Sequence, residues 1–254
     1  MPARALLLHS SGLSGRQWRR LEGGLKERGF ATLAPDFIGH GAAERWPEPR
    51  PFSFRQDVSA ITTELRGGAP SHVIGHSYGG LVGLLAALAA PESVRSLTLF
   101  EPVAFGVLDP VADADAFAEL SRVDHDWGAT EQDHDRWLSM FVDYWGGQGA
   151  WEALREEARA EFRRGGWAVR EGVRTLVEDR TPAEAYRALR VPTRLVTGER
   201  SPLAARRVVQ RLSENLADAR VVVIPGAGHM APLTHGELVH RVVYEALGSA
   251  SESR

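Results

Sequence analysis

The architecture of this chain follows from seven residues, Ile74-Gly75-His76-Ser77-Tyr78-Gly79-Gly80. A short, largely apolar run over residues 72–74 precedes the serine, and an Ala/Leu-rich run over residues 81–88 follows it. The first run is typical of a buried strand and the second of a helix, so the pattern predicts a sharp turn centred on Ser77. Glycines at 75 and 79 permit a turn that side chains would obstruct. We therefore expect the Ser77 hydroxyl to stand clear of a sheet edge, at the N-terminus of a helix.

A Gly-x-Ser-x-Gly pattern between a strand and a helix resembles the nucleophile elbow of the α/β-hydrolase family, and the resemblance extends from about Arg4 to about Leu247. It implies the α/β class, with a mostly parallel, doubly wound sheet and an inserted α-helical cap. The motif alone is not decisive, because Gly-rich turns between strands and helices also serve ordinary packing. The flanking pattern and the partner residues identified below favour the catalytic interpretation.

The bulk composition restricts the class of protein. A chain of 254 residues can bury one sizeable core, and 43% hydrophobic with 25% charged residues is typical of a soluble globular protein. A net charge of −3 provides no basic field for nucleic acid or for an anionic membrane, so we expect neither as a partner. The absence of cysteine excludes disulfides and thiolate metal sites.

The N-terminal residues are expected to form a first strand and not a signal peptide. Too few residues precede the first apolar run, Ala5–Leu8, for a signal peptide, and no apolar run is long enough to span a bilayer. We expect a soluble cytoplasmic protein that acts on a small-molecule substrate without a cofactor. The sequence leaves open whether the protein forms a homodimer.

The remaining apolar runs predict the other elements of the sheet and its helices. Buried strands are expected at residues 5–8, 30–34, 94–100, 193–197 and 220–224. Helices are expected at residues 21–28, 53–66, 204–216 and 235–247.

The first strand ends in His9-Ser10-Ser11-Gly12, where the family typically has a loop beginning His-Gly. By that resemblance, the backbone N–H groups of Ser11 and Tyr78 form the oxyanion hole. Position 10 is Ser and not Gly, which leaves the backbone path of this loop open. His9 is interpreted as a residue that fixes the loop. An ordinary strand-to-helix turn is the alternative.

The composition and the hydrophobic pattern of the sequence change between Pro102 and Val191. Five of the seven tryptophans lie there, and the pattern is helical. The resemblance implies that residues 103–190 form a helical cap and that residues 1–102 and 191–254 form the hydrolase core. A helix capped by Thr130 carries Trp137, Phe141 and Trp145 at a spacing of four, and these residues are candidates for the substrate pocket. A second helix is expected from about Trp151, with a stop at Gly165-Gly166.

Two acidic-histidine clusters, Asp124-His125-Asp126 and Asp133-His134-Asp135, fall within the cap. Adjacent residues point in different directions, so neither cluster supplies a set of metal ligands on one face. We interpret both as solvated faces or helix-start acids and expect no metal.

His229 is the predicted base. It lies in the Gly-rich loop Pro225–Pro232, after the last strand, and follows the serine in the chain order that the family requires.

The sequence offers two candidates for the acidic residue that would pair with His229. Relatives usually place Asp at the position that Ser201 occupies here, and a hydroxyl carries no charge at neutral pH. Glu101 follows the strand over residues 94–100, where a subset of the family carries its acid. A carboxylate buried there needs a partner, which a cationic imidazole would supply. Glu101 is therefore the predicted acid, and Glu199 is the alternative.

The leading interpretation is a serine hydrolase that cleaves a small or medium apolar ester, thioester or lactone through an acyl-enzyme on Ser77. A carbon–carbon bond hydrolase or an acyltransferase would use the same triad. A ligand-binding or receptor-type protein with little turnover is the alternative from another class.

Overall fold

The computed structural model describes residues 2–46, 51–121 and 127–252. Its centre is a six-stranded sheet with the order β2-β1-β3-β4-β5-β6, in which every neighbouring pair is parallel. The strands are β1 Arg4–Leu8, β2 Ala31–Leu33, β3 Ser71–His76, β4 Val94–Phe100, β5 Thr193–Gly198 and β6 Ala219–Ile224. The predicted α/β class with a doubly wound parallel sheet is thereby confirmed.

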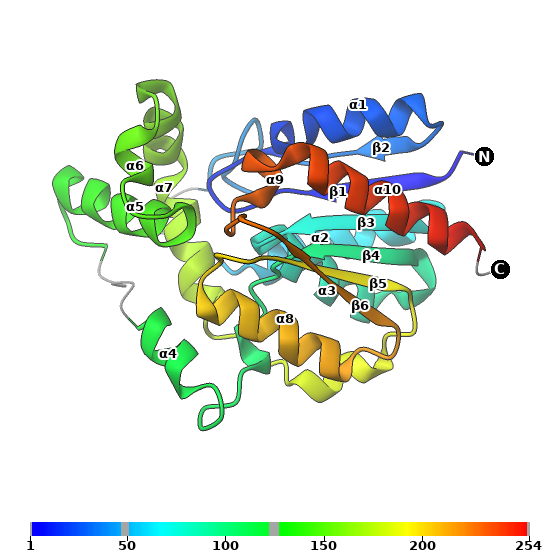
Figure 1. Ribbon diagram of the computed structural model, residues 1–254. Coiled ribbons are helices and arrows are strands. Elements are labelled where there is room, and N and C mark those ends of the chain that lie inside the picture. The colour runs from blue at the N-terminus through cyan, green and yellow to red at the C-terminus, as the bar shows by residue number, and fades with distance from the viewer. Residues whose placement is uncertain (1, 47–50, 122–126, 253–254) are drawn as a thin grey trace.

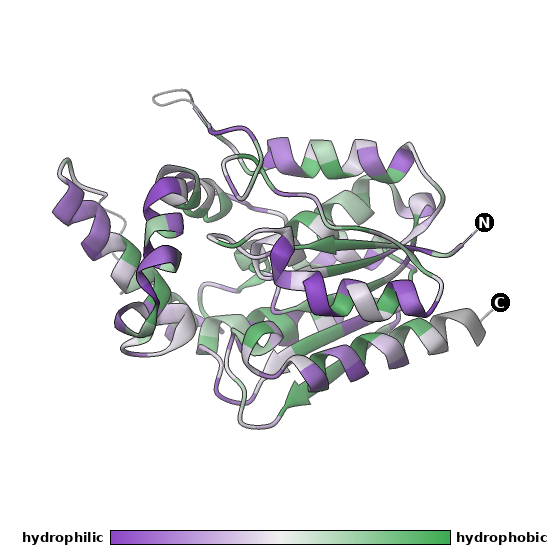
Figure 2. Ribbon diagram, turned by 90° about the horizontal axis from the view of Figure 1, so that it is seen from above, coloured by the Kyte–Doolittle hydropathy of each residue, from purple (hydrophilic) through white to green (hydrophobic). Residues whose placement is uncertain are grey.

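Helices cover both faces of the sheet (Figure 1). One face carries α1 Arg19–Glu27 and α10 Gly236–Glu252, and the other carries α2 Arg55–Arg66, α3 Tyr78–Ala89 and α8 Leu203–Asn215. Within β1, Leu6 and Leu8 pack into one core cluster while Ala5 and Leu7 pack into the other, because alternate strand residues face opposite sides. Figure 2 shows the hydrophobic strands lying between these helices.

Short helical turns connect several of these elements. They are η1 Gly15–Trp18, η2 Pro91–Ser93 and the four-residue helix α9 Ala231–Thr234. None of the described helices combines the length and the apolar composition that a crossing of a bilayer requires.

The segment between β4 and β5 is mostly helical in its described part, and its helices α5, α6 and α7 lie at the carboxyl ends of the strands (Figure 1). Its elements are η3 Phe105–Val107, α4 Ala114–Leu120, α5 Glu131–Gly146, α6 Ala150–Ala153, α7 Glu156–Leu176 and η4 Ala183–Ala188. The side chain of Thr130 accepts the N–H of Asp133 in a capping box at the start of α5, so the helix start predicted at Thr130 is confirmed.

The predicted second helix of this segment is wrong in both its start and its stop. Trp151 lies on the short α6, the chain is extended at Leu154, and α7 then continues through Gly165 and Gly166. A Cβ on Gly166 would lie 2.9 Å from the ring of Trp127. This glycine therefore permits close packing and does not end the helix.

Other boundaries differ by less. The helix expected at Ser53 begins at Arg55, and the helix expected to end at Leu247 continues to Glu252. The strand predicted at residues 94–100 is observed with the same ends.

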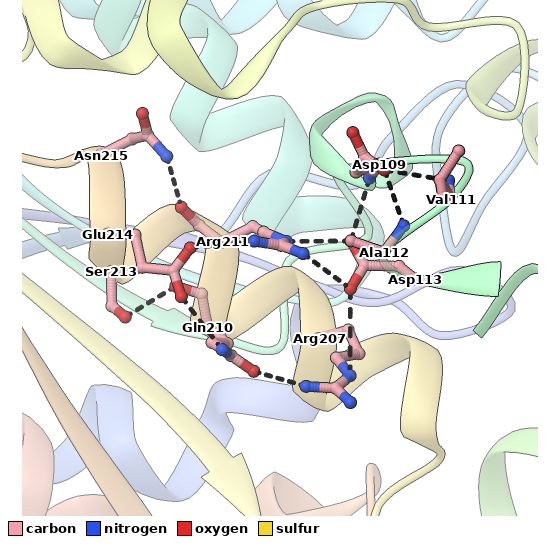
Figure 3. A network of polar contacts seen from close by, with 10 residues as sticks. All are labelled: Asp109, Val111, Ala112, Asp113, Arg207, Gln210, Arg211, Ser213, Glu214 and Asn215. Atoms are coloured by element: carbon pink, nitrogen blue, oxygen red, sulfur yellow. Dashed lines mark hydrogen bonds and ion pairs between the residues drawn. The ribbon is translucent and has the colours of Figure 1, made fainter. Parts of the chain in front are cut away.

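The start of the helical segment is fixed to the core at Asp113 (Figure 3). Its Oδ2 accepts the N–H of Asp109 and the Nε–H of Arg211 on α8, both at 2.9 Å. Burial opposes ionisation of this carboxyl, but the hydrogen bonds from Arg211 and Asp109 hold its pKa below the usual value. On α4 itself, Glu119 accepts the N–H groups of Leu203 and Ala204 at the start of α8. The helix α4 is thus anchored to the core by two carboxylates.

Candidate active site

Ser77 lies between β3 and α3 with φ at +54°, a left-handed value that is uncommon outside glycine. A Cβ on Gly75 would lie 2.6 Å from the carbonyl oxygen of Gly79, and one on Gly79 would lie 2.5 Å from that of Leu8. Both positions therefore require glycine. The Ser77 N–H donates to the carbonyl oxygen of Phe100 at 2.8 Å, which ties the turn to the end of β4.

Glu101 follows β4 directly and contacts His229. Its Oε2 accepts the Nδ1–H of His229 at 2.6 Å, and its Oε1 accepts the hydroxyl of Thr197 and the N–H of Gly198 at 2.5 and 2.8 Å. The residue is 2% exposed, so burial opposes the charge of its carboxylate. The interactions with His229, together with the hydroxyls of Ser201 and Thr197, outweigh that burial, and the pKa of Glu101 falls below its usual value.

Backbone strain is concentrated at two of these positions. Among the described residues other than glycine, only Ser77 and Glu101 have positive φ, at +54° and +44°. Such conformations cost roughly 1–3 kcal/mol each and persist where the surrounding structure enforces them, often at functional sites. The strain thus coincides with two of the three residues predicted for catalysis.

The alternative acid lies elsewhere. The carboxylate of Glu199 is exposed and accepts the N–H of Gly226 at 2.7 Å, three residues before His229 in the same loop. Ser201, at the position where the resemblance led us to expect an Asp, is buried. Its hydroxyl contributes to the lowered pKa of Glu101 without a well-formed hydrogen bond to any described residue. The geometry therefore pairs His229 with Glu101, while Glu199 supports the loop.

A hydrogen-bonded relay links the serine turn to the two loops beside it. Gln17 accepts the N–H of Ser10 at 3.0 Å through Oε1 and donates to Nδ1 of His76 at 3.0 Å. The Nε2–H of His76 then donates to the carbonyl oxygen of His229 at 2.9 Å. Burial lowers the pKa of His76 to about 3, so this ring stays neutral and keeps one tautomer.

Sequence reasoning missed both residues of this relay. The only sign of this relay in the sequence is the histidine directly before Ser77. The residues around Gln17 do not indicate where its side-chain amide points. In the described structure, no hydrogen bond joins Ser77 Oγ to His229 Nε2. The relay nevertheless fixes the backbone of the His229 loop to the residue next to the serine.

The two predicted oxyanion donors lie beside Ser77. Ser11, Tyr78 and Ser77 line one cavity, and Tyr78 is the first residue of α3, where a helix N–H has no intrahelical acceptor. His9 holds the loop before Ser11, since its Nε2 accepts the N–H of Phe37 at 3.0 Å. Burial lowers the pKa of His9 to about 3, which is consistent with the structural role predicted for it.

The side chain of Tyr78 is buried and is held by Asp57. The tyrosine hydroxyl donates to Asp57 Oδ2 at 2.6 Å, and Oδ1 of the same carboxyl accepts the N–H of Ile38. Burial raises the pKa of Asp57 to about 6. Asp57 was also missed in the sequence, where it appears as an ordinary acid in the first turn of α2.

The cavity at Ser77 has a volume of about 250 Å³ and a largely apolar lining, which includes Val103, Phe105, Leu120, Phe141, Trp145 and Leu176. Two of the three aromatic residues predicted for the pocket, Phe141 and Trp145, are in this lining. Trp137 is not among its described lining residues and packs instead in a cluster with Trp127 and Val169. A spacing of four overshoots one helical turn, so the three side chains do not share one direction.

The acidic-histidine cluster at Asp133-His134-Asp135 has structural partners. Asp133 caps α5, His134 stacks on Trp127, and Asp135 accepts two hydrogen bonds from Arg163. The other cluster, Asp124-His125-Asp126, lies outside the described residues. Within the described part of the chain, no group of three or more His, Cys, Asp or Glu side chains is arranged to hold a metal ion.

Comparison with known proteins gives a consistent result. A model of the Alpha/beta hydrolase family matches residues 5–242. The pimeloyl-[acyl-carrier protein] methyl ester esterase of Chromobacterium violaceum is 30% identical over 246 residues, which cover 95% of this chain and 93% of that protein. Lipase LipV of Mycobacterium tuberculosis is 41% identical over 103 residues, which cover 40% of this chain and only 38% of the lipase.

Solved structures agree in fold. The esterase EaEST from Exiguobacterium antarcticum superposes with a TM-score of 0.72 at 16% identity, covering 96% of this chain and 92% of that one. A mutant of the meta-cleavage product hydrolase CumD from Pseudomonas fluorescens, complexed with acetates, gives a TM-score of 0.72 at 20% identity, covering 98% and 91%. At these identities, the likeness concerns the fold alone.

Proposed function

Because the chain belongs to the α/β-hydrolase family, we propose that it is a serine hydrolase that cleaves a small or medium apolar carboxylic ester, thioester or lactone through an acyl-enzyme on Ser77. One observation carries the proposal above the others. The buried pair of Glu101 and His229 adjoins a strained serine turn that opens into an apolar cavity.

Each group has a role in the proposed reaction. Glu101 holds the Nδ1–H tautomer of His229 and stabilises the imidazolium that forms when Ser77 loses its proton. The N–H groups of Ser11 and Tyr78 face the developing oxyanion, and removal of one such donor typically costs about 3–4 kcal/mol of transition-state stabilisation. Water activated by His229 then releases the acyl group.

The reaction requires a hydrogen bond from Ser77 Oγ to His229 Nε2 that the described structure does not contain. Catalytic hydrogen bonds are often long or poorly aligned without substrate and tighten only in the complex. The ring of Trp145 lies against that of His229, with 4.1 Å between centroids. We expect the two catalytic side chains to approach each other when substrate binds, with the indole still packed against His229.

Several features favour acyl chemistry. The nucleophile is a serine, so a route through an alkyl ester of an aspartate is unavailable. The cavity lining is apolar, which suits an acyl chain. Two of the relatives are named as a methyl ester esterase and a lipase, which supports an ester as the substrate.

The test is turnover of p-nitrophenyl acetate, butyrate and hexanoate by the purified protein. We expect many turnovers per chain, and Ser77→Ala should fold normally by circular dichroism while it loses all turnover above background. A release of nitrophenol that stops at one equivalent, or none at all, would instead indicate a binding protein. Turnover that survives in Ser77→Ala would overturn the assignment of the nucleophile.

A further inference from the structure

A second chamber adjoins the cavity at Ser77. It has a volume of about 560 Å³, and its lining includes Glu119, Asp143, Arg200 and His229. Of the described residues, only Tyr144 and Trp145 line both spaces. Ser77 lines the first space and His229 lines the second, so the indole of Trp145, packed on His229, separates the nucleophile's cavity from the base's chamber.

This division assigns the acyl chain and the alcohol of an ester to different spaces. The assignment rests on the proposed function. In acylation, the bond from Ser77 Oγ to the acyl carbon forms, and the bond from that carbon to the alcohol oxygen breaks. The serine proton reaches the alcohol oxygen through His229. Water later adds hydroxide to the acyl carbon and returns a proton to Ser77, which releases the acid. The leaving alcohol must therefore lie on the side of His229, and the acyl chain must lie in the cavity of Ser77.

The two spaces differ in chemistry. The first is lined mostly by apolar side chains, and its two charged lining residues are Asp179, which is paired with Arg55, and Arg180. The second has a larger polar share in its lining, with Glu119, Asp143 and Arg200 as its charged residues. Glu119 accepts the N–H of Leu203 at 3.1 Å, the N–H of Ala204 at 3.0 Å and the hydroxyl of Tyr144 at 2.9 Å. Structural hydrogen bonds therefore hold the carboxylate of Glu119 in place on this side of the second chamber.

The other charged groups complete the chamber. Asp143 accepts the N–H of Gly149 at 3.2 Å and that of Trp151 at 2.8 Å. The backbone N–H of Arg200 donates to the carbonyl oxygen of Ala227 at 2.8 Å, which holds this arginine beside the loop of His229. Its guanidinium has no ion pair among the described residues and is available to a ligand.

We propose that the second chamber binds the leaving group and that this group is an uncharged, hydroxylated alcohol, as in an ester of a small glycol or polyol. While His229 is neutral, as it is when substrate binds, two carboxylates and one guanidinium give the lining a net negative charge, which opposes an anionic leaving group. A hydroxyl both donates and accepts hydrogen bonds, so it is matched by carboxylate oxygens and by Arg200 together. The substrate is then an apolar acyl chain joined to a polar alcohol.

A pair of constitutional isomers tests the orientation directly. In 2-hydroxyethyl hexanoate the hydroxyl is on the leaving arm, and in hexyl glycolate it is on the acyl arm. With each rate divided by that of hydroxide-catalysed hydrolysis, we expect kcat/KM for 2-hydroxyethyl hexanoate to be at least about tenfold higher. Equal values, or a preference for hexyl glycolate, would overturn the assignment.

Substitutions test whether Arg200 recognises the hydroxyl of the leaving alcohol. Arg200→Gln should lower the kcat/KM ratio of 2-hydroxyethyl hexanoate to ethyl hexanoate by about fivefold or more, because the hydroxyl loses a charged donor. Arg206→Gln is the matched control: Arg206 is exposed on α8 and lines neither space, so the ratio should not change. A ratio that Arg200→Gln leaves unchanged would contradict the proposal.

Two further outcomes are informative. If carboxymethyl hexanoate, with an anionic leaving arm, were the best of these esters, the inferred alcohol class would be wrong. If p-nitrophenyl butyrate were not turned over either, the proposed function would fail together with this inference. Turnover of p-nitrophenyl butyrate without any preference between the isomers would overturn only the assignment of the chamber.

Discussion

At the scale of single residues, the site depends on which residue supplies the carboxylate that pairs with His229. Ser201 occupies the position where the resemblance implies an acid, and Glu101 reaches His229 from the end of another strand. The sequence indicated this exchange because a hydroxyl carries no charge at neutral pH. The positive φ of Glu101 could not be predicted, because the sequence around it contains no glycine or other sign of a strained turn.

Substitution of the two glutamates separates their roles. Glu101→Gln should reduce kcat by about 10³–10⁴-fold, because a neutral amide neither stabilises the imidazolium nor enforces its tautomer. Glu199→Gln, the matched control in the neighbouring loop, should change kcat by less than about twofold, since its contact is with the N–H of Gly226. Ester hydrolysis measured at saturating substrate decides the matter, and the reverse pattern would make Glu199 the acid.

A relocated acid extends the same test. Ser201 is buried, and its hydroxyl would lie 2.7 Å from a Cβ placed on Gly198, whose N–H donates to Glu101. The double variant Glu101→Gln with Ser201→Asp should therefore recover at least about tenfold of the lost activity. No recovery, with the fold intact, would show that the loop after β5 no longer reaches the base.

At the scale of elements, the strands and the serine turn could be predicted because apolar runs and paired glycines act locally. The helix α7 could not. A glycine pair that ends a helix and a glycine pair that admits a neighbour are identical in sequence, and only the packing distinguishes them. Besides Gly166 against Trp127, the ring of Phe162 lies against Gly12 and the methyl of Ala168 against Gly39.

These contacts predict that close approach at Gly39 stabilises the packing of α7 on the core. Gly39 has φ at +75°, and its Cβ would lie 2.5 Å from that of Ala168. Gly39→Ala should therefore lower the free energy of unfolding by about 2–4 kcal/mol, from left-handed strain and overpacking together. Urea denaturation measures the change.

Gly23→Ala is the matched control for that substitution. Gly23 lies on α1, and a Cβ there meets no atom within 4 Å. This variant should raise the free energy of unfolding by about 0.5–1 kcal/mol, as alanine does in a helix interior. Equal effects at the two positions would contradict this explanation of how α7 packs.

At the scale of the whole molecule, three loops meet at the carboxyl edge of the sheet. They follow β3, β4 and β6 and carry Ser77, Glu101 and His229. Chain order and strand ends were sufficient to predict this convergence, since parallel strands end at one edge. The lining of the pocket was not predictable from local pattern. Whether Trp137 or Trp145 faces the substrate depends on how α5 lies against α7 and the core.

The long-range polar contacts, like the lining of the pocket, could not be predicted from the sequence. The relay from Gln17 through His76 spans residues 10 to 229, and the anchor of Asp113 to Arg211 joins segments 98 residues apart (Figure 3). Neither has a local signature, because each partner alone is an ordinary polar residue.

Activation of Ser77 as a nucleophile by His229 and Glu101 is tested most directly by the rate and site of labelling with a fluorophosphonate, followed by intact mass and peptide mass spectrometry. We expect a single adduct per chain, located on Ser77, absent in Ser77→Ala and formed at least about a hundredfold more slowly in His229→Ala. An adduct on another residue, or labelling of Ser77 at an unchanged rate without His229, would contradict the claim.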